Sequence, residues 1–155
     1  MSAAEHDPDP ASDALGVFLD FREADMLLWR RAGAALGIST MAALGLARIL
    51  RANERQAPLR QVDLSESLGL SAAGTSAIVT ALVERGFVHR EPSLLDGRAV
   101  HLTAGEHVGP VLDELLAADA KFLRLAGEVS AEGLRGFMHI MAGMGALSGQ
   151  KYAQG

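Results

Sequence analysis

The sequence of 155 residues has no cysteine, only five prolines, 5% aromatic residues and fewer basic than acidic side chains, 14 against 19. The absence of cysteine excludes disulfide bonds, thiolate metal sites, cysteine nucleophiles and thiol redox switches, and it favours an intracellular, cytoplasmic location. Because 49% of the residues are nonetheless hydrophobic, we expect closely packed helices built largely from alanine, leucine, valine, methionine and glycine. The length allows one domain of ordinary size.

Long hydrophobic runs are also missing. The longest uncharged stretch, Ala32–Ala47, contains Ser39 and Thr40 and is shorter than the roughly 20 residues that a membrane-spanning helix requires. Residues 1–13 are acidic and contain proline, whereas a signal peptide begins with a basic region followed by an apolar one. We therefore expect no membrane association, a disordered acidic tail at residues 1–13, and a second tail at residues 150–155.

The residue patterns that carry catalysis or bind metals are missing too. There is no Ser-His-Asp spacing signal, no phosphate-binding glycine loop and no paired carboxylate motif. The five histidines do not pair at the three- or four-residue spacing of a helical metal site. We therefore predict neither a metal site nor a cofactor, and a binding protein rather than an enzyme.

The distribution of charge singles out the middle of the chain. Residues 36–103 carry seven basic and six acidic side chains, while the segments on either side are acidic. All seven of these basic residues are arginines, which suit contacts with phosphate and with nucleic-acid grooves. The acidic total argues against nucleic acid, but its distribution allows a weakly positive site in the middle.

Apolar residues recur at helical spacing in the first third of the chain. From Ser12 to Leu36 they cover more than one face of a helix, so this helix needs more than one neighbour, either a second subunit or the interior of the monomer. Ser39 or Thr40 can cap a second helix, which ends before Pro58.

The second predicted helix carries a row of arginines on one face, formed by Arg48, Arg51 and Arg55. Side chains at this three- and four-residue spacing are neighbours on a helix. The row could contact phosphate or the carboxylate of a ligand, and the alternative is an ordinary solvated face.

Residues 59–103 contain the most informative pattern. A short helix around Arg60–Leu68 is stopped by Gly69, and Ser71 caps a second helix that runs to about Arg85. Two helices so close in sequence must cross rather than lie antiparallel. The pattern therefore predicts a helix-turn-helix.

A two-stranded hairpin follows this second helix. We expect strands at Phe87–Arg90 and Arg98–Leu102, joined through the turn signal Asp96-Gly97. A helix-turn-helix followed directly by a hairpin is a winged helix, in which the second helix enters the major groove of DNA and the hairpin reaches an adjacent groove or the backbone. The order of the elements therefore predicts DNA binding.

Two further helices complete the predicted fold, which is mainly α with a small β wing. Thr103-Ala104-Gly105-Glu106 fits a capping box that opens a long helix, and Ser130 caps a final helix. The final helix has an apolar face rich in methionine, which belongs either to a core or to a dimer surface.

Three motifs of the winged part resemble those of the MarR family of bacterial transcription regulators. The stretch Leu64–Ser71 looks like the start of the family's helix-turn-helix, and Leu82–Arg90, which reads LVERGFVHR, looks like the end of its recognition helix. Arg90, five intervening residues and then Asp96-Gly97-Arg98 resemble its wing. The likeness covers about residues 15–148.

The resemblance implies a homodimer that reads a near-palindromic operator with two winged lobes. Residues 14–58 and 104–149 would supply the scaffold and the dimerisation layer, and residues 59–103 the DNA-binding region. Asp96 would hold the wing, and Arg98 would insert in or near the minor groove.

The helix predicted to enter the major groove has an uncharged outer face. It offers no Arg, Lys, Asn or Gln, the side chains that read guanine or adenine through paired hydrogen bonds. We expect its N-terminus and its hydroxyl groups to bind phosphate and its alanines to contact thymine methyl groups. The predicted DNA-binding residues are Arg60, Ser71, Ala72, Ala73, Ser76, Thr80, Arg90, Asp96 and Arg98.

The resemblance also implies a repressor that is released by a small aromatic or amphipathic ligand, bound between the dimer helices and the winged lobe. An apolar slot with an arginine beside it would suit such a ligand. The candidate lining residues are Met26, Trp29, Arg30, Met41, Leu44 and Arg48. Because the chain is acidic and the outer face of the recognition helix is uncharged, the alternative is a winged-helix module that binds protein, with weak or no DNA binding.

Overall fold

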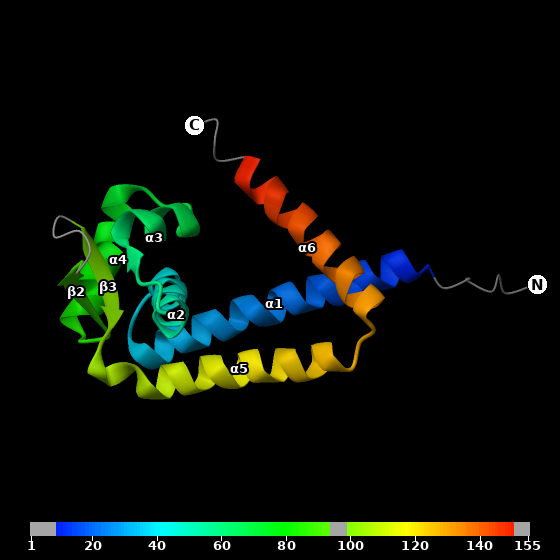
Figure 1. Ribbon diagram of the computed structural model, residues 1–155, viewed down its shortest axis with the longest axis horizontal. Coiled ribbons are helices and arrows are strands. Elements are labelled where there is room, and N and C mark those ends of the chain that lie inside the picture. Colours follow the sequence, from blue (N-terminus) through cyan, green and yellow to red (C-terminus); the bar gives the residue numbers. More distant parts are fainter. Residues whose placement is uncertain (1–8, 94–98, 151–155) are drawn as a thin grey trace, which may run out of the picture.

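The computed structural model describes residues 9–93 and 99–150, which form a winged lobe and a set of long helices (Figure 1). Within those ranges no single helix is both long and apolar enough to span a membrane, although two bent pairs of consecutive helices pass on length and composition. The elements in chain order are α1 (Pro10–Leu36), α2 (Thr40–Glu54), β1 (Leu59–Arg60), α3 (Gln61–Leu68), α4 (Ala72–Glu84), β2 (Val88–Pro92), β3 (Val100–Ala104), the 3-10 helix η1 (Glu106–Val108), α5 (Gly109–Gly127) and α6 (Ala131–Gln150).

The first helix begins earlier than the sequence pattern predicts. α1 starts at Pro10 instead of Ser12, and Asp9 is its N-cap, because the Asp9 carboxylate accepts a hydrogen bond from the backbone N–H of Ala11 (3.1 Å). Proline fits the first turn of a helix, where its missing N–H costs no hydrogen bond. The last residues of the predicted tail are therefore helical.

The chain bends by 93° between α1 and α2. Gly37 ends α1 with a φ of 65°, in the left-handed region that glycine adopts without steric penalty. Gly33 lies under the corner, where a Cβ atom would come within 2.9 Å of the carbonyl oxygen of Ile38. Ser39 caps α2 by accepting a hydrogen bond from the backbone N–H of Ala42 (3.1 Å), in agreement with the prediction.

α2 is the central helix of the winged lobe. Its residues Leu46, Ile49 and Leu50 are at most 1% exposed. The buried side chains that pack with them come from α3, α4, β2 and β3, and are Leu64, Val79, Leu82, Val88 and Leu102. Because the buried residues of α4 lie on one side of that helix, its opposite side faces away from the core.

α3 and α4 form the predicted helix-turn-helix, with a bend of 113° between them. Gly69 ends α3 with a φ of 63°, and Ser71 caps α4 by accepting a hydrogen bond from the backbone N–H of Gly74 (3.1 Å). α4 ends at Glu84, and Gly86 follows with a φ of 71°. The turn residues therefore do what the sequence pattern predicts.

The wing is a sheet of three strands in the order β1-β3-β2, rather than a hairpin of two. β1 pairs antiparallel with β3, with Leu59 opposite Leu102 and Arg60 opposite His101. The sequence pattern places Arg60 at the start of the short helix, and Arg60 is indeed the N-cap of α3, although it also pairs with β3 as the last residue of β1.

The hairpin strands lie further along the chain than predicted. β2 ends at Pro92 rather than at Arg90, and β3 runs to Ala104 rather than to Leu102. The register places Val88 opposite Ala104 and Pro92 opposite Val100. Both strands have five residues.

The predicted capping box at the end of the wing does not form. Thr103 and Ala104 belong to β3, and the chain passes through η1 before α5 begins. The buried hydroxyl of Thr103 has no hydrogen-bond partner in the part of the chain that the structure describes. Pairing of Thr103 with His89 across the sheet therefore prevails over the local capping pattern.

Two backbones touch at the base of the wing. The backbone N–H of Gly105 donates a hydrogen bond to the carbonyl of Phe87 (2.9 Å), and a Cβ atom on Gly105 would overlap the carbonyl of Gly86. Glycine is needed at position 105 for this close approach rather than for helix capping.

α1 and α5 both extend away from the winged lobe, and α6 turns back at an angle to them (Figure 1). Ser130 caps α6 as predicted, because its hydroxyl accepts a hydrogen bond from the backbone N–H of Gly133 (3.1 Å). The rings of Phe122 and Phe137 meet between α5 and α6, with centroids 6.2 Å apart. Many large apolar side chains of these helices are exposed: Leu15, Val17, Leu19, Phe21, Met26, Leu27, Leu28, Phe122, Leu123, Leu125, Phe137, Met138, Ile140, Met141 and Met144.

Candidate nucleic-acid interface

The outer face of α4 consists of small side chains and hydroxyl groups. Ser71, Ala72, Ala73 and Thr80 are exposed, and Ser76 is half-buried. Helical spacing brings these residues, all predicted DNA contacts, to one side of the molecule. The face allows close approach to another surface but carries no charge of its own.

The N-terminus of α4 lies at one end of this face. The Ser71 hydroxyl accepts a hydrogen bond from Gly74, and the Thr75 hydroxyl donates one to the Ser71 carbonyl (3.1 Å). These bonds fix the first turn of the helix. The N–H groups and the dipole of a helix N-terminus favour binding of an anion such as phosphate.

Arg90 supplies positive charge at the other end of the face. It lies on β2, and its Nη2 is 3.4 Å from the Thr80 hydroxyl oxygen on α4. Both side chains are exposed. The wing therefore brings a guanidinium group, which suits contacts with phosphate, beside a helix that has no such group on its outer face.

Arg60 is exposed but already paired. Its Nη2 and Nε contact the two carboxylate oxygens of Asp63 at 2.7 and 3.0 Å, and its backbone N–H donates to the same carboxylate (2.8 Å). The side-chain hydrogen bond from Arg60, followed by the backbone hydrogen bond, holds the pKa of Asp63 below its ordinary value. A phosphate bound by Arg60 would therefore share the guanidinium with Asp63.

Asn53 supports the wing, and sequence reasoning missed it. Its Nδ2 donates to the Leu102 carbonyl (3.0 Å), and its Oδ1 accepts from the backbone N–H of Ala104 (3.3 Å). β1 forms backbone hydrogen bonds with one edge of β3, and the Asn53 side-chain amide adds further hydrogen bonds to the β3 backbone. The partners are about 50 residues away in sequence, so no local signal indicates the contact.

Arg85 ties α4 to the corner between α1 and α2. Its Nη2 donates a short hydrogen bond to the carbonyl of Gly37 (2.6 Å). An open depression of about 300 Å³ lies beside this contact, and its lining residues are Gly37, Ile38, Ser39, Ala42, Ala77, Ile78, Ala81 and Arg85. Sequence reasoning missed Arg85 as well, because its partner is a backbone atom 48 residues away.

The winged part of the chain matches a known family by sequence. Residues 36–99 match the sequence model of the MarR family. The motifs Leu64–Ser71 and Leu82–Arg90 lie inside the matched residues, so the predicted resemblance is confirmed.

Solved structures of MarR-type regulators have the same fold as the whole chain. The chain is similar to the transcriptional regulator SlyA, with a TM-score of 0.63 and 15% identity over 91% of this chain and 97% of that one. It is similar to PcaV from Streptomyces coelicolor, solved with its natural ligand, with a TM-score of 0.55 and 19% identity over 96% and 99%. A mutant of MepR from S. aureus, solved bound to an oligodeoxyribonucleotide, gives a TM-score of 0.51 and 18% identity over 85% and 96%. A search of the curated proteins found no match.

These likenesses confirm the predicted fold class, a mainly helical MarR-type winged helix with a small antiparallel sheet. Two of the residues predicted to act in the MarR-type wing, Asp96 and Arg98, lie outside the described ranges 9–93 and 99–150. Their roles stay predictions.

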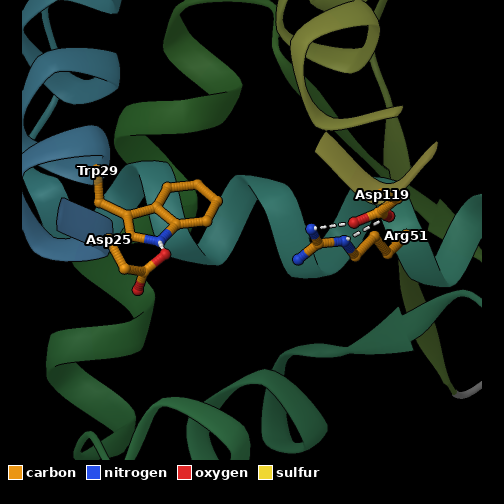
Figure 2. Close-up of polar contacts among 4 residues, drawn as sticks. All are labelled: Asp25, Trp29, Arg51 and Asp119. Carbon is orange, nitrogen blue, oxygen red and sulfur yellow. Dashed lines mark hydrogen bonds and ion pairs between the residues drawn. The ribbon is translucent and has the colours of Figure 1, made fainter. Parts of the chain in front are cut away.

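The residues predicted to bind a MarR-type ligand lie on α1 and α2. Trp29 packs against the core of the lobe, and its Nε1 donates a hydrogen bond to Asp25 (3.1 Å), as Figure 2 shows. The depression beside Arg85 contains none of the six predicted residues. The other five are the exposed Met26, Arg30 and Arg48 and the half-buried Met41 and Leu44.

Proposed function

We propose that the protein is a homodimeric MarR-type transcription regulator that binds a near-palindromic operator in double-stranded DNA. The observation that carries this proposal is the shared outer surface of α4 and β2, where Arg90 lies against Thr80 beside a row of small side chains. The mutant of MepR that shares this fold binds an oligodeoxyribonucleotide. Residues 59–103 would form the DNA-binding region.

The chemistry of this surface favours contacts with the DNA backbone over direct reading of bases. The N-terminus of α4 and Arg90 would bind phosphate, and the hydroxyl groups of Ser76 and Thr80 would add hydrogen bonds. Ala72 and Ala73 would contact thymine methyl groups. We expect much of the specificity to come from the width of the minor groove at the wing, sensed by Arg98, and from the fixed spacing of two half-sites.

The exposed apolar side chains of α1, α5 and α6 support the homodimer. Soluble monomers rarely expose contiguous apolar patches of more than a few hundred Å². A second copy of the chain, related by a two-fold axis, would cover the same helices on both subunits. Residues 14–58 and 104–149 would therefore form the scaffold and the dimerisation layer.

Regulation by a small ligand is the third part of the proposal. PcaV, which shares the fold, was solved with its natural ligand. In this chain, Met26 and Trp29 lie on α1 and Arg48 lies on α2, where it would provide a positive charge for an aromatic or amphipathic acid. The two lobes of the dimer would be at one distance when bound to DNA and at another when free. Such a ligand would release a repressor from DNA only if it bound the DNA-free conformation more tightly than the DNA-bound one. A thermal-shift screen with aromatic acids tests this part.

DNA binding is tested with a duplex that the full chain selects from a randomised library. We expect the selected duplex to bind at least ten-fold tighter than a shuffled one, by fluorescence anisotropy, and binding of both to weaken as salt rises. Arg90→Ala is expected to weaken binding of both duplexes and to reduce the salt dependence. Arg124→Ala, on the exposed side of α5, is the matched control.

Two results would contradict the proposal. The first is the absence of binding to any duplex at low salt, which would favour the alternative of a protein-binding winged-helix module. The second is a monomer in sedimentation equilibrium at the concentrations used for DNA binding. A near-palindromic operator read by two lobes requires the dimer.

A further inference from the structure

An ion pair joins the winged lobe to the middle of α5 (Figure 2). Arg51 on α2 places its Nη2 and Nε at 2.8 and 3.2 Å from the two carboxylate oxygens of Asp119. The guanidinium and the carboxylate therefore meet in the bidentate geometry, which orients both side chains as well as attracting them. The two residues are 68 positions apart in sequence.

Asp119 lies far enough along α5 that a movement at the ion pair changes the direction of the helix axis. The helix starts at Gly109, directly after the wing, so Asp119 lies about 15 Å along its axis and the end at Gly127 about 27 Å. A shift of about 3 Å at Asp119 would turn the axis by about 11° and move Gly127 by about 5 Å. A small change at the ion pair therefore becomes a larger one where α5 meets α6.

The ion pair is poorly placed to stabilise the fold. The side chains of Arg51 and Asp119 are 38% and 45% exposed. Water screens such pairs, so their contribution to folding is small. The core of the lobe is instead formed by buried side chains of α2, the helix that carries Arg51, among them Leu46, Ile49 and Leu50. The paired hydrogen bonds of this partly buried bidentate contact suit a role in orienting the two helices more than a role in stability.

We propose that Arg51 and Asp119 are positioning residues, which fix the direction of α5 relative to the winged lobe and so the distance between the two recognition helices of the dimer. The inference rests on the proposed function, because it requires a homodimer held by α1, α5 and α6. Arg51 thus contacts a carboxylate of its own chain, whereas the sequence pattern allows phosphate, a ligand carboxylate or solvent as its partner.

The absence of cysteine from the chain allows a direct measurement. The substitution Glu84→Cys, at the exposed end of α4, gives one spin label per protomer and one label-to-label distance per dimer, measured by pulsed electron paramagnetic resonance. We expect a narrow distribution of distances in the labelled parent. With Asp119→Ala, the distribution is expected to shift or broaden by several ångströms, the scale of the roughly 5 Å movement that a 3 Å shift at Asp119 produces at Gly127.

Four controls separate orientation from other effects. Asp113→Ala removes an exposed carboxylate from the same helix and is expected to leave the distance unchanged. The exchanged pair, Arg51→Asp with Asp119→Arg, is expected to restore the narrow distribution. The thermal midpoint of Asp119→Ala should stay within about 4 °C of the parent, and the fluorescence of Trp29, the single tryptophan, should not change.

DNA binding gives a second measurement. For Asp119→Ala, we expect the affinity for the selected duplex to fall several-fold, while duplexes with one or two added base pairs between the half-sites lose less. If the labelled Asp119→Ala protein has the distance distribution of the parent, the inference is overturned and the homodimer stands. If the parent shows no distance between labels, the homodimer is overturned and the inference with it.

Discussion

The winged lobe buries its large apolar side chains, whereas the long helices α1, α5 and α6 expose many of theirs. In the lobe, Leu46, Leu64 and Leu102 are at most 1% exposed, whereas Val17 on α1 and Leu123 on α5 are about 70% exposed. The lobe completes its own core within one chain, and the helices present surfaces that another chain would have to cover. Disruption of the lobe should therefore act on folding itself, and disruption of the helices on assembly.

The largest expected effect comes from the core of the lobe. Leu46→Ala should lower the free energy of unfolding by about 2–5 kcal/mol, because it removes buried apolar surface and leaves a cavity in a packed region. The change, measured by urea denaturation, should be the same at different protein concentrations. Val62→Ala, on the exposed side of α3, should change the free energy by less than about 0.5 kcal/mol. Equal effects of the two substitutions on the free energy of unfolding would contradict the interpretation that the lobe is stabilised by its buried core.

The next effect concerns the helices. Ile140→Asp places a charge on the apolar face of α6, where Ile140 is exposed. It should raise the dissociation constant of the dimer by about ten-fold or more, because burying an isoleucine contributes about 1.5–3 kcal/mol and a carboxylate cannot replace it. Sedimentation equilibrium measures this change. An unaltered dissociation constant would place α6 outside the interface.

A smaller effect is expected at the base of the wing. Gly105→Ala should destabilise the protein by about 1–3 kcal/mol, because the added methyl group collides with the Gly86 carbonyl and the surrounding backbone must shift. Gly127→Ala is the matched control, since no atom lies within 4 Å of a Cβ at that position. Urea denaturation of both variants gives the comparison. A neutral Gly105→Ala would mean that the two backbones are free to separate.

The smallest expected effect lies in the polar contacts of the lobe. The pKa of Asp63 is lowered in the folded protein by its hydrogen bonds to Arg60, so its stabilising contribution is present at neutral pH and is lost as the pH falls through the acidic range. Asp63→Asn should lower the thermal midpoint by roughly 1–3 °C at pH 7. The difference between the two proteins should shrink as the pH falls below the ordinary pKa of an aspartate side chain. Glu84→Gln, which replaces another exposed carboxylate, is the control.

Much of the lobe could be predicted because its signals are local. Gly69, Ser71 and Ser130 terminate or cap helices through contacts with residues only a few positions away. Such caps depend on the identity of one or two side chains and on partners within a few residues. The order of helices and strands follows from them, and so does the winged-helix fold.

The features that escaped prediction depend on partners far away in sequence. β1 has two residues and exists only because β3 lies beside it. The pattern from Thr103 to Glu106 satisfies a capping box locally, yet pairing with His89 decides the outcome. The contacts of Asn53 with β3 likewise join segments about 50 residues apart. Hydrophobic periodicity and capping rules contain no information about such contacts.

The order of strands in the wing also bears on colloidal behaviour. β3 is enclosed on both sides, so the sheet ends at β1, which is only two residues long, and at β2. β2 contains His89, Arg90, Glu91 and Pro92, and charged residues and proline on an outer strand oppose the addition of strands from other molecules. β2, which carries the candidate DNA-binding residue Arg90, therefore also opposes aggregation. Replacing its charged residues with apolar ones would carry a cost in solubility as well as in binding.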